Sequence, residues 1–273
     1  KRHVDIKVET NTRGLSTPPA LVKAVIAALE ARGYKPAELF IMDQSEDHLH
    51  DAGFLPLNAH EGEGVFDGVQ VIALNRGRYY SPKWSYDSNL TAPDAAVQAL
   101  NRRQYEWSFV PNPRQSLLPV PLLLDVDFWI NLPVGMDDDA LGASGALVDA
   151  TLYAASNTAR FFNNAQSGAK AVADIAAVPE LSRGWVFSIL SLEHYQFIGG
   201  PQFNSLYTRS EPILLMSPNP VILDQILFER INNARQLHNF PLLDRPLFLD
   251  YADLPTMHLG TSDPKRMYWV KLP

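Results

Sequence analysis

The sequence predicts an α/β protein with a mostly parallel or mixed sheet flanked by helices. Strand-like and helix-like segments alternate along the chain, as they do in βαβ units. The first unit is well marked, because residues 3–9 alternate apolar and polar side chains, 17–33 form a capped helix pattern and 38–43 form a second short strand. Helical crossovers join parallel strands. We therefore expect a single domain over residues 1–273, with 108–119 as the best candidate for an internal boundary.

The first helix carries clear end signals. Thr17 is a candidate N-cap, Pro18 or Pro19 stands in the first turn, and Gly33 closes the helix. The rest of the N-terminal half is punctuated by prolines and turn residues. There we expect a loop leading into a short helix over 44–54, a strand or a hairpin turning at Asp67-Gly68 over 65–75, an aromatic loop over 76–90, a helix over 93–105 and a connector with Pro111, Pro113 and Pro119.

The most apolar part of the chain, residues 122–132, predicts a buried central strand. A polar turn with Asp137, Asp138 and Asp139 is expected to follow it. The remaining elements are predicted from the same periodicities. They are helices over 143–156 and 169–181, a strand over 185–197, a break at Gly199-Gly200-Pro201, a short strand over 212–216, a helix that starts after Asn219 and Pro220, and an edge strand over 267–272.

The composition and the missing motifs exclude several classes of function. The 23 lysines and arginines against 30 acidic residues give a net charge of −7, which argues against a nucleic-acid partner. The absence of cysteine excludes iron–sulfur clusters and cysteine-ligated zinc. No run approaches the ~20 apolar residues of a membrane-spanning helix, so we expect no membrane span. The chain also lacks the glycine-rich motifs for NAD or ATP, the G-x-S-x-G turn of serine hydrolases and the H-E-x-x-H motif of zinc proteases.

The loop between the first strand and the first helix is a candidate ligand site. Ligands of open α/β sheets bind at the carboxyl ends of strands, and helix N-termini favour anions. Asn11, Arg13, Ser16 and Thr17 could contact an anionic or polar ligand there, although Thr17 acting only as a cap and a solvated Arg13 are about equally expected. Asp43 ends the second strand and should lie beside this loop, where it could orient a hydroxyl group, bind a metal or act as a base.

Polar residues near the central strand give further candidates. Asn131 is predicted to contact a ligand, and Ser144 and Gly145 stand at a tight helix entry where close packing is the simpler explanation. Asp137 and Asp138 could bind Mg²⁺ or Ca²⁺, but a solvated turn is the stronger interpretation.

One histidine completes the candidate list. His194 follows Glu193 and precedes a glycine turn, so it joins Asp43 as a candidate acid or base, although a lone histidine is more often structural.

Three segments resemble those of a known family. Residues 6–34, the segment WINLPV with GASGALVDAT, and the segments IGGP and LLMSPNPVILD resemble, in this order, motifs of the domain of unknown function 362 family. The resemblance implies one α/β domain with an unassigned activity. Many members have a lysine and a histidine where this chain has Gly135 and Met136, and Asn219 stands in place of an aspartate. Any activity that needs those groups is therefore in doubt.

The sequence is consistent with two hypotheses of function. The first is a ligand-binding or enzymatic protein that takes a small molecule, and the second is a non-catalytic accessory subunit that binds a protein partner through the aromatic segment 79–86. The start at Lys1 fits the removal of an export signal, which predicts a periplasmic or extracytoplasmic location, with the cytoplasm as the alternative.

Overall fold

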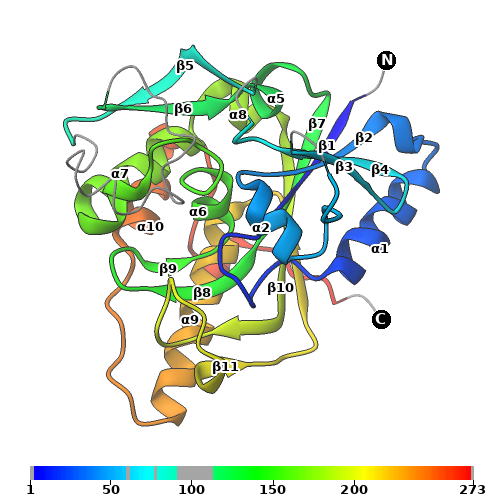
Figure 1. Cartoon of the computed structure of the whole chain (residues 1–273). Coiled ribbons are helices and arrows are strands. Elements are labelled where there is room, and N and C mark those ends of the chain that lie inside the picture. Colours follow the sequence, from blue (N-terminus) through cyan, green and yellow to red (C-terminus); the bar gives the residue numbers. More distant parts are fainter. Residues whose placement is uncertain (1–2, 60–61, 77–78, 91–112, 272–273) are drawn as a thin grey trace.

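The fold is described by a computed structural model that covers residues 3–59, 62–76, 79–90 and 113–271. Among these residues, ten strands form one mixed sheet and two more form a separate two-stranded sheet, with helices packed around them (Figure 1). The sheet strands are β1 (Val4–Val8), β2 (Leu39–Asp43), β3 (Glu63–Phe66), β4 (Val69–Ala73), β7 (Phe128–Leu132), β8 (Val134–Asp138), β9 (Gly142–Ser144), β10 (Trp185–Gln196), β11 (Thr208–Arg209) and β12 (Leu214–Ser217). The two-stranded sheet pairs β5 (Tyr80–Asp87) with β6 (Gln115–Pro119) in antiparallel orientation. The helices are α1 (Pro19–Glu30), α2 (Glu46–Asp51), α5 (Val120–Leu124), α6 (Ala146–Ala150), α7 (Ala165–Ala176), α8 (Pro179–Gly184), α9 (Pro220–Leu237) and α10 (Leu247–Ala252).

The order in which strands are added to the sheet reverses between β1 and β7. From β1 the chain continues to β2 and β4 on one side, whereas β7 and β10 lie on the other side of β1. The pairs β1–β2, β1–β7, β2–β4 and β7–β10 are all parallel. Ligands of open α/β sheets bind at the carboxyl ends of strands where the strand order reverses. In this fold that position is the crevice formed by the ends of β1 and β7.

The two faces of β1 have opposite character. Val4, Ile6 and Val8 pack with the buried side of α1 in one hydrophobic cluster. The alternating residues Asp5, Lys7 and Glu9 therefore point to the other face, which α6 and α7 cover. All five residues of β1 are buried, so the polar face of this strand lies in the interior rather than in solvent.

Several sequence predictions are confirmed. The first βαβ unit, the hairpin alternative at Asp67-Gly68, the strand that ends before Gly199 and the helix that follows Asn219 all form as expected. The positive φ of 89° at Gly33 fits its place just after α1.

Other predictions are wrong for identifiable reasons. The apolar run 122–132 is split, because Pro121 stands in the first turn of the short helix α5 and the strand β7 starts only at Phe128. The expected polar turn at Asp137 is instead part of β8, which pairs with β9. The helix expected over 143–156 is reduced to α6 after a short strand, and the expected aromatic loop forms β5.

Two further differences concern the start of α1 and the C-terminal end of the chain. Thr17 is not the N-cap of α1, because Pro18 takes that position and the Thr17 side chain bonds elsewhere. Residues 267–271 form no strand, and the helix predicted over 93–105 lies outside the described residues. Within the described part of the chain, no helix is both long and apolar enough to cross a membrane.

Candidate functional site

A charged group lies in the interior at the carboxyl ends of β1 and β2. The Nζ atom of Lys7 donates hydrogen bonds to Asp149 Oδ1 at 2.5 Å and to the carbonyl oxygen of Val8 at 2.7 Å, and it lies 2.9 Å from Asp43 Oδ1. The side chains of Lys7 and Asp149 have no exposed surface, and that of Asp43 is 1% exposed. Lys7 thus joins two strands and α6 through ionic contacts that water does not reach.

Glu9 extends this buried group toward β7. Its Oε2 atom accepts a hydrogen bond from the Val134 amide at 2.9 Å, and its own amide donates to Thr17 Oγ1 at 2.8 Å. The Thr17 hydroxyl in turn donates to the carbonyl oxygen of Leu132 at 2.5 Å. Glu9 and Thr17 therefore hold loop 10–18 against the junction between β7 and β8. We refer to Lys7, Glu9, Asp43 and Asp149 together as the buried charged centre.

Several oxygens around the buried charged centre have no hydrogen-bond donor. They are Glu9 Oε1, Asp149 Oδ2 and Asn131 Oδ1. Asn131 lies beside Lys7 in the β1–β7 pair, and its Nδ2 atom donates to the carbonyl oxygen of Ala146 at 3.0 Å. Buried polar atoms are nearly always paired, so each of these unpaired acceptors is an exception to the general rule.

Burial shifts the pKa values of these groups. It raises the pKa of Glu9 well above its ordinary value, and the neighbouring charge of Asp149 adds to the rise. Burial also raises the pKa of Asp149 to about 7, against the opposing attraction of Lys7. For Lys7, burial acts to lower the pKa, but Asp149 and Asp43 outweigh it, and the pKa is raised. Lys7 is therefore charged at neutral pH, whereas Glu9 and Asp149 hold protons more readily than an ordinary carboxyl group does.

Tyr153 lies next to the buried charged centre. Burial raises its pKa, and the charges of Glu9 and Asp138 add to this effect, while the Ser144 hydroxyl opposes it. Neither the Tyr153 hydroxyl nor that of Ser144 makes a hydrogen bond of ordinary geometry.

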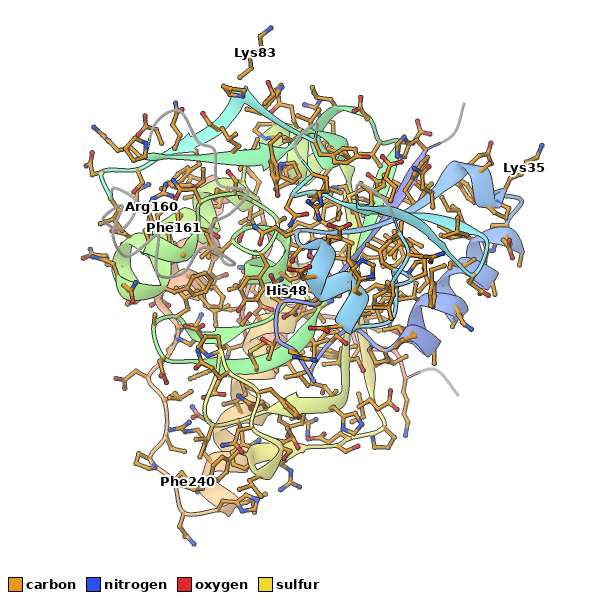
Figure 2. All side chains as sticks on the ribbon, in the orientation of Figure 1. Lys35, His48, Lys83, Arg160, Phe161 and Phe240 are labelled. Atoms are coloured by element: carbon orange, nitrogen blue, oxygen red, sulfur yellow. The ribbon has the colours of Figure 1, made fainter. Side chains whose placement is uncertain are left out.

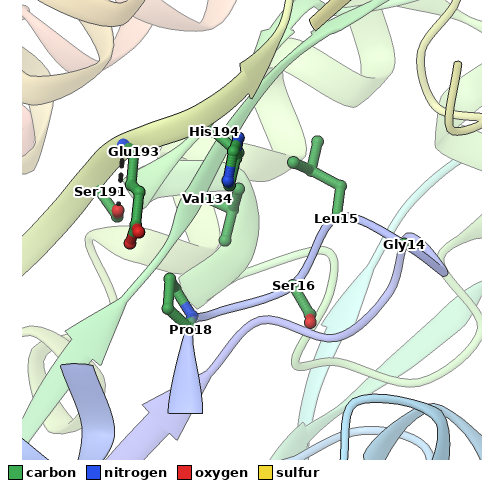
Figure 3. Close-up of a pocket in the computed structure, with 8 residues that line it drawn as sticks. All are labelled: Gly14, Leu15, Ser16, Pro18, Val134, Ser191, Glu193 and His194. Carbon is green, nitrogen blue, oxygen red and sulfur yellow. Dashed lines mark hydrogen bonds between the residues drawn. The ribbon is translucent and has the colours of Figure 1, made fainter. Parts of the chain in front are cut away.

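A pocket of about 180 Å³ lies beside Val134, the first residue of β8. Figure 3 shows Glu193 and His194 on β10 facing the loop that carries Leu15, Ser16 and Pro18. Gly14, Val134 and Ser191 complete its lining. The Ser191 Oγ atom accepts a hydrogen bond from the Glu193 amide at 3.3 Å. The pocket thus combines an apolar wall with two hydroxyls, a carboxylate and an imidazole, contributed by three separate segments of the chain.

The predicted site residues are divided between these two places. Ser16 and His194 line the pocket, whereas Asp43 and Asn131 belong to the interior. Asp43 does lie beside loop 10–18 as expected, since its Oδ2 atom accepts hydrogen bonds from the Thr10 amide at 2.7 Å and the Thr10 hydroxyl at 2.5 Å.

The other predicted loop residues do not reach the pocket. The Arg13 side chain is 83% exposed, and its Nε atom lies 3.4 Å from Asp51 Oδ2. Thr17 is buried, and its hydroxyl makes the hydrogen bonds to Glu9 and Leu132 described above. The Nδ2 atom of Asn11 is buried without a partner. Gly145 is needed for close packing, because a Cβ atom there would collide with the side chain of Asp224.

The predicted metal ligands are engaged by backbone amides. Asp137 accepts hydrogen bonds from Gly199 and Gly200, each at 3.0 Å. Asp138 Oδ1 accepts from Ala140 and Leu141 at 2.9 and 2.7 Å. Among the described residues, no group of three or more His, Cys, Asp or Glu side chains is arranged to hold a metal ion.

Sequence reasoning missed Lys7, Glu9 and Asp149 as site residues. The available signal was the alternation of polar residues in β1, which places Lys7 and Glu9 on one face of a strand in a parallel sheet. His48 on α2 (Figure 2) has a buried Nδ1 atom without a hydrogen-bond partner.

Comparisons with known proteins are limited to structure. No family model matches the sequence, and no curated protein matches it. A protein from Thermotoga maritima solved by a structural genomics consortium is 12% identical with a TM-score of 0.45, covering 88% of this chain and 55% of that one. The lactate racemase apoprotein from Thermoanaerobacterium thermosaccharolyticum is 8% identical with a TM-score of 0.38, covering 80% of this chain and 46% of the other. The chain spans about half the length of these two proteins, and the resemblance to the domain of unknown function 362 family stays a prediction.

Proposed function

We propose that this chain binds a small polar molecule with hydroxyl or amino groups in the pocket between loop 10–18 and β10. The observation that carries the proposal is the place of the pocket. Part of its lining is the loop that follows β1, and Val134 follows β7, and the strand order reverses between these two strands. Its volume of about 180 Å³ has room for roughly six groups of the size of water, at about 30 Å³ each. The ligand is therefore small.

The chemistry of the lining favours a polar ligand over an anion. Pro18 and Pro19 stand at the start of α1 and have no N–H groups, which removes donors that an anion would use. Glu193 places a carboxylate at the pocket, and Arg13 points elsewhere. A carboxylate repels an anion and accepts hydrogen bonds from hydroxyl or ammonium groups.

The aromatic segment gives little support to the accessory-subunit alternative. Tyr79, Tyr80, Trp84 and Tyr86 are partly buried and pack against the hydrophobic core. The Tyr80 hydroxyl donates to the carbonyl oxygen of Ala154 at 2.6 Å, and the Tyr86 hydroxyl donates to Asp174 at 3.1 Å. These side chains cover the core of the protein, so we propose no second function.

Ligand-observed NMR tests the proposal directly. We would screen a panel of small polyols, amino alcohols and amino acids against the wild-type protein and against the variants Glu193→Gln and His194→Ala. Saturation transfer to at least one compound is expected for the wild type and should be lost in both variants. Glu30→Gln, at an exposed position on α1, is the matched control and should bind as the wild type does. Binding that survives in both pocket variants would place the ligand elsewhere.

A further inference from the structure

The strand β12 lies at an open edge of the large sheet. Among the described strands it pairs with β10 alone, in antiparallel orientation, and the Leu192 amide donates to the Ile213 carbonyl at 3.0 Å. Hydrogen-bonding groups alternate between the two sides of an antiparallel strand, so the N–H and C=O groups of Leu214 and Met216 point away from β10. Within the described part of the chain, no hydrogen bond reaches these groups. The edge therefore offers donors and acceptors to a further strand.

The side chains on this edge are apolar and exposed. Leu214 is 56% exposed and Met216 is 60% exposed, and they share one face of the strand because they stand two positions apart. Residues 212–220 include no charged side chain, and Glu211, just before them, lies 3.1 Å from Arg230. Natural sheets protect open edges with charged side chains, and an apolar edge without them is a template for pairing with another chain.

The donors on this edge are arranged symmetrically about Leu215. Leu214 and Met216 each supply one outward N–H group, whereas Pro212 and Pro218, two positions away on either side, supply none. Two identical edges related by a two-fold axis at Leu215 therefore match each other. Leu214 of each copy lies opposite Met216 of the other, and each of these pairs can exchange both of its N–H···O bonds. The same register sets apolar side chains against apolar side chains and opposes no like charges.

The C-terminal segment adds apolar surface at one end of β12. Asn219, two residues after the strand, has its Nδ2 atom 3.7 Å from Met267 Sδ. The side chains that follow Met267 are exposed, at 93% for Tyr268, 53% for Trp269 and 65% for Val270. Specific interfaces bury roughly 1,200 Å² or more, so an edge strand of four residues needs neighbours of this kind.

We propose that two copies of this chain form a dimer in which their β12 strands pair antiparallel around a two-fold axis at Leu215. The two large sheets then continue into each other, and this edge is no longer open. Leu214 and Met216 of one copy pack against Met216 and Leu214 of the second. The inference does not rest on the proposed function, because the interface needs no ligand.

Sedimentation equilibrium tests the inference on the whole chain. Between about 1 μM and about 1 mM, the wild type should pass from the mass of one chain to the mass of two. A variant with both Leu214→Lys and Met216→Lys sets lysines opposite lysines, and it should keep the mass of one chain over the whole range. The matched control is Leu57→Lys, at a leucine that is 95% exposed in the segment before β3, at the opposite edge of the sheet. This control should dimerise as the wild type does.

A second variant makes the test specific for the proposed register. Leu214→Glu with Met216→Glu should also keep the mass of one chain by itself. An equimolar mixture of the glutamate and lysine variants should dimerise, because each glutamate then lies opposite a lysine. Both positions are exposed, so the variants should fold, which circular dichroism checks.

Two results would overturn the inference. The first is a wild type that keeps the mass of one chain over the whole concentration range, which would leave the edge to a strand of a different protein. The second is a lysine variant that still dimerises, since the interface would then lie elsewhere on the molecule.

Discussion

Replacing Lys7 with methionine removes the only cation of the buried charged centre and leaves its partners in place. Methionine fills a similar volume, so the change is mainly electrostatic. Asp43 and Asp149 lose a cation 2.9 and 2.5 Å away, and the Val8 carbonyl loses a donor at 2.7 Å. Removing one partner of a buried ion pair costs about 3–5 kcal/mol of unfolding free energy. The total for a domain is about 5–15 kcal/mol, so Lys7→Met should remove a large share of the stability.

The size of this loss should depend on pH. Without Lys7, the two aspartates can escape an unpaired buried charge only by taking up protons, and that uptake becomes easier by about 1.4 kcal/mol per proton for each unit that the pH falls. The cost of Lys7→Met should therefore be largest above pH 7 and clearly smaller near pH 5.

Urea unfolding followed by tryptophan fluorescence measures the effect. Trp129 and Trp185 are stacked with ring centroids 4.9 Å apart and Trp129 is fully buried, so the signal reports on the core of the sheet. Lys83→Met, at an exposed position on β5 (Figure 2), is the matched control and should stay within about 0.5 kcal/mol of the wild type. A loss below about 1 kcal/mol for Lys7→Met at pH 7 would refute the view that Lys7 neutralises this interior.

Three other changes test neighbouring parts of the structure. Thr17→Val should lower the free energy of unfolding in urea by about 1–3 kcal/mol, because the Leu132 carbonyl loses the Thr17 hydroxyl as donor and the Glu9 amide loses it as acceptor. The control Thr208→Val removes a hydroxyl on the surface and should cost less. Asp224→Ala removes the carboxylate that accepts from the Ala146 and Leu147 amides, and faster hydrogen exchange of both amides is expected, with no change in α1 as the internal control. Burial raises the pKa of Asp5 from 3.8 to about 6. Asp5 therefore stabilises the fold fully below pH 3.8, and this contribution is lost as the pH rises through 6. Asp5→Asn should flatten that part of a plot of unfolding free energy against pH, and an unchanged slope would contradict the raised pKa.

The first βαβ unit shows how far sequence patterns lead. Alternation in residues 4–8, the helix end at Gly33 and the strand before Asp43 together predict two parallel strands and place Asp43 beside loop 10–18, and the structure confirms each of these. Such alternation is typical of a strand with one buried face and one solvent-exposed face. In fact its polar face is covered, because β1 lies between β2 and β7 and has helices on both sides. Which face is covered depends on segments more than a hundred residues away, and local pattern contains no such information.

The errors around residues 120–156 have a different origin. Pro121 and the run of leucines after it satisfy both a short helix and a strand, and only the packing around β7 decides between them. Asp149 stands in a segment of small residues that predicts close packing, which the tight fit of Gly145 against Asp224 bears out. The partner of Asp149 is Lys7, 142 positions earlier in the chain. Long-range ionic contacts of this kind leave no periodic trace in a sequence.

Glu9 and Thr17 connect the buried charged centre to the pocket. This connection suggests a reason for burying charged groups, which lowers stability unless they are well paired. Well-packed apolar side chains would stabilise the ends of β1 and β2 at least as well as buried ions do. Buried ionic groups are therefore most useful where the protein must hold a segment in a fixed position rather than gain stability. Here its side chains fix loop 10–18 to the β7–β8 junction, through the bonds from Val134 to Glu9 and from Thr17 to Leu132. Those two attachments set the distance between Ser16 and Val134, and hence the width of the pocket where we propose that the ligand binds.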